Sequence, residues 1–193
     1  MMLGENSFYS EDELKNLGLK SIGRGVLLSR YARIYSAELI EIGDNVRIDD
    51  FCILSGKITF GKYIHVSAYT GFFAGSEGIE IQDYATISSG CMLYGLSDDY
   101  SGDYLTNSMI PNEFRNVRKA KLTVGKFSIV GTGCRIFPGV TIGEGTAVGA
   151  MSMVKKNLKA WTIYAGIPCR EIRPRSREML KYEEPLLEKY YEG

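Results

Sequence analysis

Two neighbouring aspartates and a single histidine are the side chains of this sequence best suited to carrying a proton. Asp98 and Asp99 stand in a stretch rich in Asp, Tyr, Asn and Ser, and His65 is the only histidine in the chain. A carboxylate or an imidazole beside a reacting group can accept or return its proton. Each also has a structural explanation, because Asp beside Ser and Gly often stabilises a turn and a surface histidine can bond a backbone carbonyl. These residue types leave open whether Asp98, His65 or neither acts as a base.

The stretch around Asp98 also contains side chains suited to holding a sugar or a phosphate. Hydroxyls, amides and charged groups recognise such ligands, and aromatic rings stack on a sugar or a base. Singly, each residue is more simply explained as part of the polar surface. Together they predict a substrate-binding site formed by Ser88, Ser89, Tyr94, Asp99, Tyr100, Asn112, Glu113 and Arg115.

A basic group of residues lies nearer the C-terminal end. Lys155 and Lys156 follow an apolar run, and Arg170 and Arg173 follow the segment Gly-Ile-Pro-Cys. Clustered ammonium and guanidinium groups bind phosphates, although a solvated charged surface has the same composition. We interpret this group as a site for a phosphate-bearing ligand.

Composition argues against several kinds of site and partner. One histidine cannot form a three-histidine zinc site, and Cys52, Cys91, Cys134 and Cys169 include no C-x-x-C pair, so we expect neither a metal nor a disulfide. The 23 basic and 23 acidic residues cancel, which argues against nucleic acid as a partner. No stretch approaches roughly eighteen apolar residues, and residues 1–20 lack a secretory pattern. We therefore expect a soluble, cytoplasmic protein with no membrane insertion.

Aliphatic residues that recur at every sixth position determine the expected fold. One unbroken block runs through Val124, Val130, Ile136, Ile142, Val148 and Val154. A period of six fits neither an α-helix nor a hairpin, but it fits a short strand with its turn, repeated so that three strands form one triangular coil. The position four residues after each aliphatic residue should also point inward, which places Cys52, Cys91 and Cys134 in the core. The sequence thus predicts an all-β chain folded as a parallel β-helix.

Short helices are expected at both ends of this β-helix. The run from Ser10 to Glu13 has the pattern of a capping box, which places an N-terminal cap helix within residues 1–20. A C-terminal helix is expected within residues 174–193, with a kink near Pro185.

The β-helix should occupy residues 21–173. Within it, the six-residue period is lost over residues 94–121, which predicts a long excursion loop leaving a rigid scaffold, where ligands are often bound. With 193 residues and 45% hydrophobic content, we expect a single domain spanning residues 1–193.

Three motifs resemble the closing coils of the hexapeptide-repeat acyltransferases. In chain order they are Phe137-Pro-Gly-Val-Thr-Ile-Gly143, Val148-Gly-Ala-Met-Ser-Met-Val154 and Ala165-Gly-Ile-Pro-Cys-Arg170. The resemblance covers about residues 20–173. It implies a left-handed β-helix, a homotrimer, and acetyl-CoA or another acyl-CoA bound as a co-substrate in the groove between neighbouring subunits. By matching positions it also implies contacts with coenzyme A from Gly131, Ala150, Ser152, Lys155, Lys156, Arg170 and Arg173.

Three further segments are most similar to N-acyltransferases that act on nucleotide-linked 4-amino-4,6-dideoxysugars. They are Asn6-Ser-Phe-Tyr-Ser-Glu-Asp-Glu-Leu14, Val46-Arg-Ile-Asp-Asp-Phe-Cys-Ile-Leu-Ser-Gly56 and Ile110-Pro-Asn-Glu-Phe-Arg-Asn-Val117. The O-acetyltransferases of the family have a catalytic histidine at the position where this sequence has Asp98. A hydroxyl needs a base with a pKa near neutrality, which histidine supplies, whereas a neutral amine attacks a thioester with less help. Asp98 therefore favours an amino acceptor.

The leading expectation is an acyl-CoA-dependent N-acyltransferase that acts on a nucleotide-linked amino-deoxysugar for surface polysaccharide synthesis. His65, at an outward corner of a neighbouring subunit, is the other candidate base beside Asp98. Two alternatives stay open: a sugar or polysaccharide O-acetyltransferase, and a non-catalytic β-helix scaffold. The hypothesis of a non-catalytic scaffold accounts for the six-residue repeat, but it does not account for the basic cluster or the excursion loop.

Overall fold

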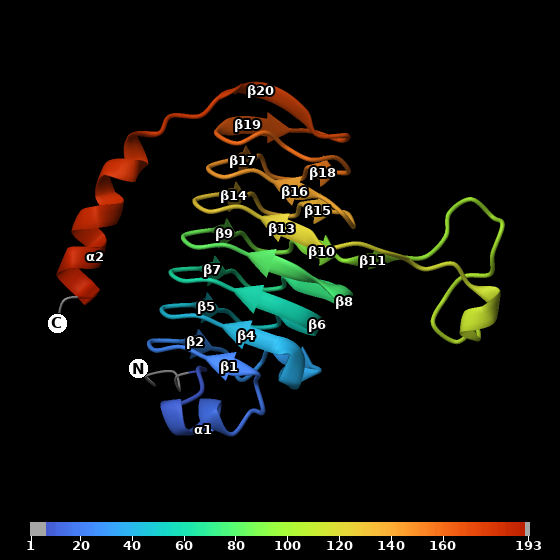
Figure 1. The fold of residues 1–193 in the computed structure, drawn as a ribbon, viewed down its shortest axis with the longest axis horizontal. Helices are drawn as coiled ribbons and strands as arrows, with labels where there is room; N and C mark the ends of the chain where they lie inside the picture. Colours follow the sequence, from blue (N-terminus) through green and yellow to red (C-terminus); the bar gives the residue numbers. More distant parts are fainter. Residues whose placement is uncertain (1–6, 192–193) are drawn as a thin grey trace, which may run out of the picture.

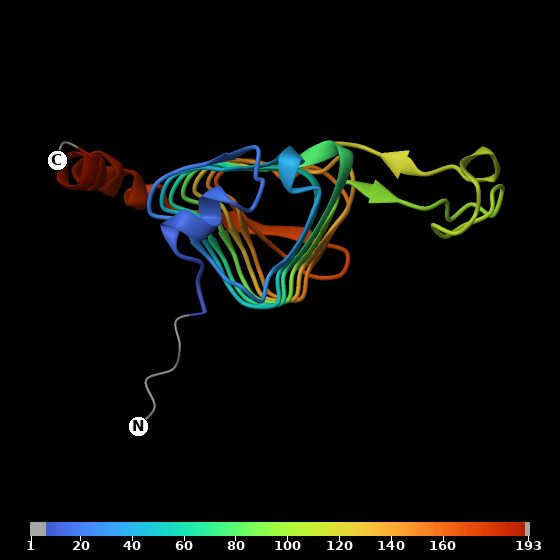
Figure 2. The same ribbon diagram turned by 90° about the horizontal axis from the view of Figure 1, so that it is seen from below.

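Triangular coils stacked along one axis make up most of the protein. The computed structural model describes residues 7–191, and Figure 1 shows the coils stacked from β1 at one end to β20 at the other. Figure 2, viewed along the stack, shows that each coil has three sides. Successive strands pair in parallel and in register, as where Arg47 lies beside His65 and His65 beside Thr86. The predicted parallel β-helix is confirmed.

The strands fall into three columns, one for each side of the prism. The first face contains β1 Ser21–Ile22, β4 Ile40–Ile42, the second halves of β6 Ile53–Phe60 and β8 Gly71–Ile81, β13 Leu122–Val124 and β16 Thr141–Ile142. The second face contains β2 Leu27–Leu28, β5 Arg47–Ile48, β7 His65–Val66, β9 Thr86–Ile87, β14 Ile129–Val130, β17 Ala147–Val148 and β19 Thr162–Ala165. The third face contains β3 Arg33–Tyr35, the first halves of β6 and β8, β10 Met92–Tyr94, β15 Arg135–Ile136 and β18 Met153–Val154.

The six-residue series forms the core. Its members from Ile42 onward are buried, and so are Leu28 and Ile40, whereas Ile22 and Ile34 at the N-terminal end are only partly buried. The three inward cysteines are buried as predicted. Each also donates a hydrogen bond to a corner carbonyl of a neighbouring coil: Cys52 to Ser67 at 3.3 Å, Cys91 to Gly131 at 3.1 Å and Cys134 to Gly149 at 3.2 Å.

Two irregularities interrupt the period at the corner between the third and first faces. The short helix η1 Ala37–Leu39 precedes β4. This helix accounts for the shift of two residues in the six-residue series, which ends one block at Ile40 and starts the next at Ile42. β8 instead continues around this corner as one strand, with Gly75 at φ 61°. Glycine adopts a positive φ without the penalty that a side chain brings.

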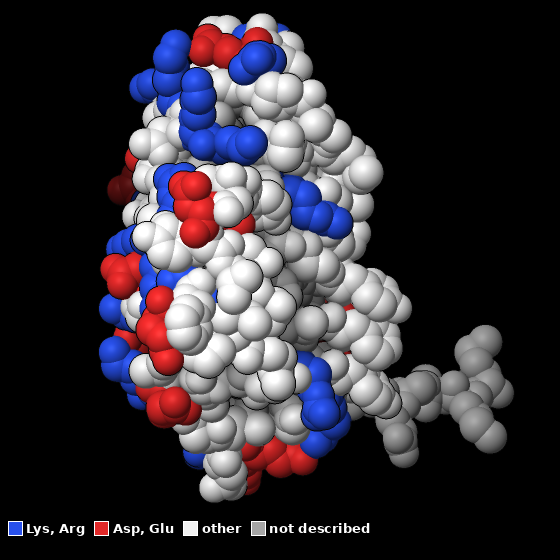
Figure 3. Space-filling view, turned by 90° about the vertical axis from the view of Figure 1, so that its right-hand side faces the viewer, with Lys and Arg blue, Asp and Glu red and all other residues white. Residues whose placement is uncertain are grey.

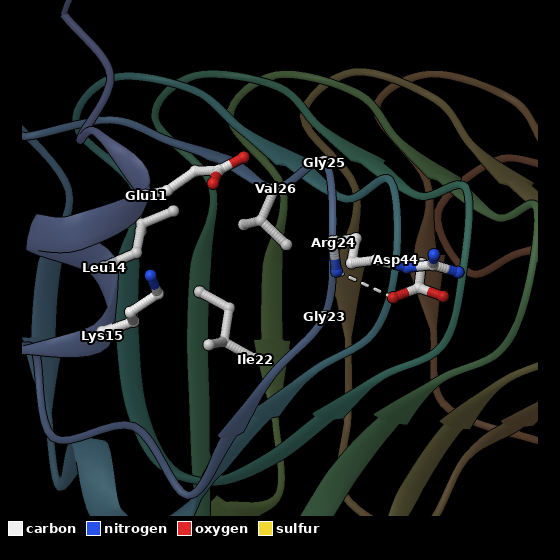
Figure 4. A pocket seen from close by; sticks show the side chains of 9 residues that line it. All are labelled: Glu11, Leu14, Lys15, Ile22, Gly23, Arg24, Gly25, Val26 and Asp44. Atoms are coloured by element: carbon white, nitrogen blue, oxygen red, sulfur yellow. Dashed lines mark hydrogen bonds between the residues drawn. The ribbon is translucent and has the colours of Figure 1, made fainter.

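A short helix closes the N-terminal end. α1 Glu11–Lys15 has the predicted capping box between Ser10 and Glu13, and Arg30 forms two hydrogen bonds with Glu13, at 2.5 and 2.6 Å. The hydrogen bond from Arg30 lowers the pKa of Glu13 to about 2. Figure 4 shows Leu14 of α1 beside Ile22 and Val26 of the first coil, around a cavity of about 440 Å³. This cavity lies at the far end from the basic cluster.

The C-terminal segment folds back along the prism. β20 Arg170–Pro174 pairs antiparallel with β19, and η3 Glu178–Tyr182 leads into α2 Glu183–Tyr191. The break expected near Pro185 lies instead between η3 and α2, because a proline is tolerated in the first turn of a helix. Arg175 holds the segment in place by donating to the carbonyls of Phe127 and Gly145, at 2.9 and 3.0 Å.

The excursion expected over residues 94–121 is a long hairpin, which we call the arm (residues 96–119). β11 Leu96–Ser97 and β12 Arg118–Lys119 pair antiparallel at its base, and η2 Asn112–Phe114 lies within it. Figure 1 shows the arm projecting away from the prism. In the part of the chain described, no helix is long and apolar enough to cross a membrane.

The buried thiols should be unreactive while the protein is folded. Burial raises the pKa of Cys52 to about 11, and Cys91 and Cys134 are equally inaccessible. A thiol reagent at pH 8 should therefore modify only the partly exposed Cys169 in the native protein, and four thiols after unfolding in guanidinium. Rapid modification of two or more thiols without denaturant would contradict the packing described.

Candidate active site

A pocket of about 800 Å³ lies where the arm leaves the prism, and we call it the arm-base pocket. Its walls come from both arm strands and from the corner of the third face. It is lined by Ser97, Asp98, Asp99, Tyr100, Asn116, Arg118, Lys119, Phe137, Pro138 and Lys155. Because β11 pairs with β12, residues about 20 positions apart in the sequence meet at this pocket.

The two aspartates of the pocket differ in how their carboxylates are used. Asp99 accepts hydrogen bonds from the Ser101 hydroxyl at 2.7 Å and the Gly102 amide at 3.2 Å, and the bond from Ser101 holds the pKa of Asp99 below its ordinary value. Asp98 accepts one longer bond, from the Asn107 amide at 3.3 Å. Asp99 therefore shapes the turn, while the Asp98 carboxylate keeps capacity to accept a further proton donor.

Aromatic and basic side chains complete the pocket. The Tyr94 ring lies between the rings of Phe73 and Phe137, at centroid distances of 5.5 and 6.2 Å, and Lys155 places its Nζ atom 5.8 Å from the Phe137 centroid. Together with Arg118 and Lys119, Lys155 gives the pocket positive charge beside its two carboxylates. Such a site suits a ligand that joins an aromatic base or sugar to phosphates.

The structure separates the predicted substrate residues into three places. Asp99 and Tyr100 line the arm-base pocket with Asp98, and Tyr94 belongs to the ring stack beside it. Farther along the arm lie Asn112, Glu113 and Arg115, where Arg115 donates to the Asn107 carbonyl at 2.9 Å and the Asn112 side chain at 2.6 Å. Ser88 and Ser89 lie at the end of β9, and they do not line the arm-base pocket.

His65 also lies outside the arm-base pocket. It belongs to β7 on the second face, so the expectation that it lies at a corner is wrong, and its Nε2 atom is 2.8 Å from Oδ2 of Asp49. The same carboxylate accepts a hydrogen bond from Arg47 at 2.7 Å through its other oxygen. Within one subunit, the structure therefore does not bring the two candidate bases together.

The residues predicted to contact coenzyme A also divide. Ala150, Lys156, Arg170 and Arg173 are exposed, and Lys155 lines the arm-base pocket. In Figure 3, Lys and Arg side chains gather toward the top of the view, the C-terminal end of the prism.

Two of the predicted coenzyme A contacts are already engaged within the coils. Ser152 is buried, and its hydroxyl donates to Gly149 at 2.6 Å and accepts from the Gly166 amide at 3.0 Å. Gly131 donates its amide to Val148 and accepts from the Cys91 thiol. A side chain at Gly131 would meet the Ala150 amide, since a Cβ there would lie 2.6 Å from that nitrogen. The Ser152 hydroxyl is unavailable to a ligand while these bonds hold.

Sequence analysis missed several residues that line the pocket. They are Ser97, Asn116, Arg118, Lys119, Phe137 and Pro138. The signal for Phe137 and Pro138 was their place in a recognised motif. Arg118 and Lys119 are adjacent basic residues just before the six-residue period resumes. Pairing the two ends of the excursion loop as antiparallel strands would have placed them beside Asp98.

No cluster typical of a metal site is found within residues 7–191, where no three His, Cys, Asp or Glu side chains come together suitably.

Comparison with known proteins identifies the family. No protein-family model matches the chain. It is 39% identical over 180 residues to the dTDP-4-amino-4,6-dideoxy-D-glucose acyltransferase of Escherichia coli, a match that covers 92% of this chain and 93% of that protein.

Solved structures agree with this match. The N-acyltransferase AntD from Bacillus cereus, in complex with dTDP and 3-hydroxybutyryl-CoA, is 50% identical with a TM-score of 0.93, covering 95% of this chain and 98% of AntD. A variant of AntD in which one serine is replaced by cysteine was solved in complex with dTDP-4-amino-4,6-dideoxyglucose and coenzyme A. It is 49% identical with a TM-score of 0.94, covering 96% of this chain and 100% of that one. A hexapeptide-repeat acetyltransferase from Vibrio cholerae shares the fold at 17% identity, with a TM-score of 0.64 over 89% of this chain and 81% of that one.

The left-handed β-helix inferred from the sequence is confirmed by these matches, and so is the resemblance on which it was based. The chain belongs to the hexapeptide-repeat acyltransferases, in the group of the dTDP-4-amino-4,6-dideoxysugar N-acyltransferases, and is a coenzyme A-dependent enzyme.

Proposed function

We propose that this protein transfers a short acyl group from acyl-CoA to the amino group of a dTDP-linked 4-amino-4,6-dideoxysugar, for use in surface polysaccharide. The arm-base pocket carries the proposal, because it combines a carboxylate, an aromatic wall and three cations. The cations suit the diphosphate, the aromatic wall suits the base or sugar, and Asp98 suits the amine. The likeness to AntD, solved with dTDP, coenzyme A and an amino sugar, supports the same assignment.

Asp98 has the central chemical role in this proposal. The sugar amine arrives mostly as an ammonium ion, and it attacks only after losing a proton. Asp98 binds this ammonium group, which first gives one proton to solvent. Asp98 then accepts the second proton as the neutral nitrogen bonds to the thioester carbonyl carbon. The carbon–sulfur bond then breaks, and coenzyme A leaves as a thiolate that takes up a proton from solvent or from Asp98. Positioning supplies much of the rate acceleration, since a neutral amine is already a good nucleophile.

A homotrimer is part of the proposal. The corner between the second and third faces exposes a column of large apolar side chains, with Tyr31 58%, Phe51 50%, Tyr69 62% and Met151 66% exposed. We call this column the apolar corner. On the first face, by contrast, ion pairs join Lys20 to Glu41 and Lys121 to Glu80. Three copies arranged about an axis at the apolar corner would remove these side chains from water.

We also propose that the enzyme works in the cytoplasm. Its four cysteines are all free thiols, which suits a reducing compartment.

The acceptor class can be tested by measuring free thiol release from acetyl-CoA. With a dTDP-4-amino-4,6-dideoxysugar the rate should saturate with sugar concentration, while the matching 4-hydroxy sugar should react at least about a hundredfold more slowly. A faster reaction with the hydroxyl sugar would instead identify an O-acyltransferase. Failure to bind coenzyme A by calorimetry would support a scaffold without catalytic activity.

Replacing Asp98 should lower turnover more than binding. D98N removes the proton acceptor, so kcat should fall by about a hundredfold or more, and the residual rate should rise with pH as more free amine forms. D99N is the matched control, since Asp99 is held by Ser101 and Gly102 and should affect kcat far less. Equal losses in the two variants would remove Asp98 from its proposed role.

The basic side chains of the arm-base pocket should strengthen binding of the nucleotide sugar. R118M removes a guanidinium beside the proposed diphosphate, so KM for the nucleotide sugar should rise by about tenfold or more with little change in kcat. K57M, at an exposed lysine outside the pocket, should leave both constants unchanged. A fall in kcat at constant KM would place Arg118 with the reacting groups instead.

A further inference from the structure

One corner of the prism carries a column of stacked aromatic rings, which we call the aromatic corner (Tyr63, Tyr84, Phe127 and Trp161). These residues lie at the turn from the first face to the second, with positive φ values between 54° and 60°. The ring centroids of Tyr63 and Tyr84 are 5.3 Å apart, those of Tyr84 and Phe127 5.0 Å, and those of Phe127 and Trp161 6.3 Å. The register of the coils therefore also aligns side chains at this corner.

A glycine lets the last ring join the aromatic corner. Gly145 occupies the corner in the coil between those of Phe127 and Trp161. A Cβ at Gly145 would lie 2.4 Å from the Cδ2 and Cε3 atoms of Trp161, so the indole ring lies directly over the glycine. Trp161 is only 8% exposed, although it belongs to an outer corner. Another part of the chain therefore covers it.

The segment after β20 provides this cover, and we call residues 175–183 the strap. The Arg175 amide donates to the Trp161 carbonyl at 2.8 Å, and the Arg175 guanidinium donates to the carbonyls of Phe127 and Gly145. One residue thereby bonds to three successive coils. Burial lowers the pKa of Arg175, and within residues 7–191 no carboxylate faces the guanidinium to offset that desolvation. The carbonyl groups are therefore what holds this cation in place.

Two further contacts hold the strap beyond Arg175. The guanidinium carbon of Arg177 lies 5.3 Å from the centroid of a Trp161 ring. Lys126 pairs with Glu183, the first residue of α2, at 2.5 Å. Figure 2 shows α2 outside the prism, on the side away from the arm. The strap is thus attached at both ends, by Arg175 next to β20 and through Lys126 next to α2.

β20 is weakly held apart from the strap. It is the last strand of the second-face sheet, it pairs antiparallel with β19, and all five of its residues are exposed. The pairing has an irregularity between Ile163 and Tyr164 of β19. The ion pair between Lys159 and Glu171 adds little stability, because its side chains are 76% and 48% exposed. Arg175 follows β20 directly and fixes its C-terminal end.

Two of the residues predicted to contact coenzyme A belong to this exposed strand. Arg170 begins β20 opposite Ala165, and Arg173 lies opposite Ile163 near its end. A guanidinium binds a phosphate more tightly when its backbone is already in place, because ordering a flexible segment on binding costs free energy. Arg175 therefore fixes the strand that carries both guanidinium groups.

We infer, on the basis of the proposed function, that Arg175 is a positioning residue for the acyl donor. Its bonds to the corner carbonyls fix β20 on the prism, and β20 then presents Arg170 and Arg173 to the phosphates of acyl-CoA. The Arg175 guanidinium is directed at the carbonyls of Phe127 and Gly145, so it acts through β20 rather than by touching a substrate. Loss of Arg175 should therefore weaken donor binding and leave acceptor binding and the chemical step unchanged.

Coenzyme A binding to Arg175 variants tests this role without an acceptor sugar. By calorimetry, R175M should raise the Kd for coenzyme A by about fivefold to tenfold. In the thiol-release assay it should raise KM for acetyl-CoA by a similar factor, with kcat and the KM for the nucleotide sugar within about twofold of wild type. R175K can still donate to the carbonyls and should recover part of the loss. K126M serves as the control, since it detaches α2 and leaves β20 attached, and its Kd should equal that of the wild type.

A donor without phosphates separates positioning from a general loss of structure. With S-acetylpantetheine, R175M should match the wild type in kcat/KM, because this donor makes no phosphate contact. In an R170M/R173M background, R175M should weaken coenzyme A binding no further, since the contacts that it positions are already gone.

Several outcomes would overturn the positioning role: an unchanged Kd in R175M and R175K, an equal loss in K126M, an equal loss with S-acetylpantetheine, or a further loss in the R170M/R173M background. R175K guards against misfolding of R175M, and it should combine an intermediate Kd with the melting temperature of the wild type. A wild-type protein that binds coenzyme A but acylates no amino sugar would instead reject the proposed function, and the calorimetric result for Arg175 would still stand.

Discussion

Stacking of each coil on the next in exact register is the constraint on which this structure depends. Every backbone amide of a short strand must find its carbonyl on a neighbouring coil, so a residue at one position of a coil lies over its equivalent in the coil below. Aliphatic columns fill the interior, and the Cys52, Cys91 and Cys134 thiols bond corner carbonyls there. The same rule arranges the outside, because it gathers residues into columns that run along a face.

Function follows from where this rule is broken. The arm leaves the stack at the corner that β8 crosses as one strand, and its two ends are held together by the β11–β12 pair and by a hydrogen bond from the Ala120 amide to the Gly95 carbonyl. Asp98 follows β11 directly at the base of the arm, where the β11–β12 pair fixes its position next to the prism, whereas Tyr100 and the residues beyond it lie farther along the arm. Loops on rigid folds commonly place reacting and recognition groups in this way.

Much of this could be predicted from the sequence because the period is so short. Six-residue spacing identifies the buried columns, and the rule for inward positions also applies to Ser152, four residues after Val148. Ser152 is indeed buried, and its hydroxyl is held within the coils by Gly149 and Gly166. The return strand of the arm could not be predicted in this way. Arg118 and Lys119 reach the pocket through antiparallel pairing, which leaves no periodic trace in the sequence.

The exposed side chains of the arm add to the argument for the proposed homotrimer. Leu105, Met109 and Phe114 are 59%, 88% and 54% exposed, although they are large and apolar. Beyond the β11–β12 pair at its base, the arm projects away from the prism and has little of its own subunit to pack against. Large apolar side chains that a single subunit leaves in water are commonly buried on assembly. The arm and the apolar corner therefore favour the same proposal, in which a neighbouring subunit covers these side chains.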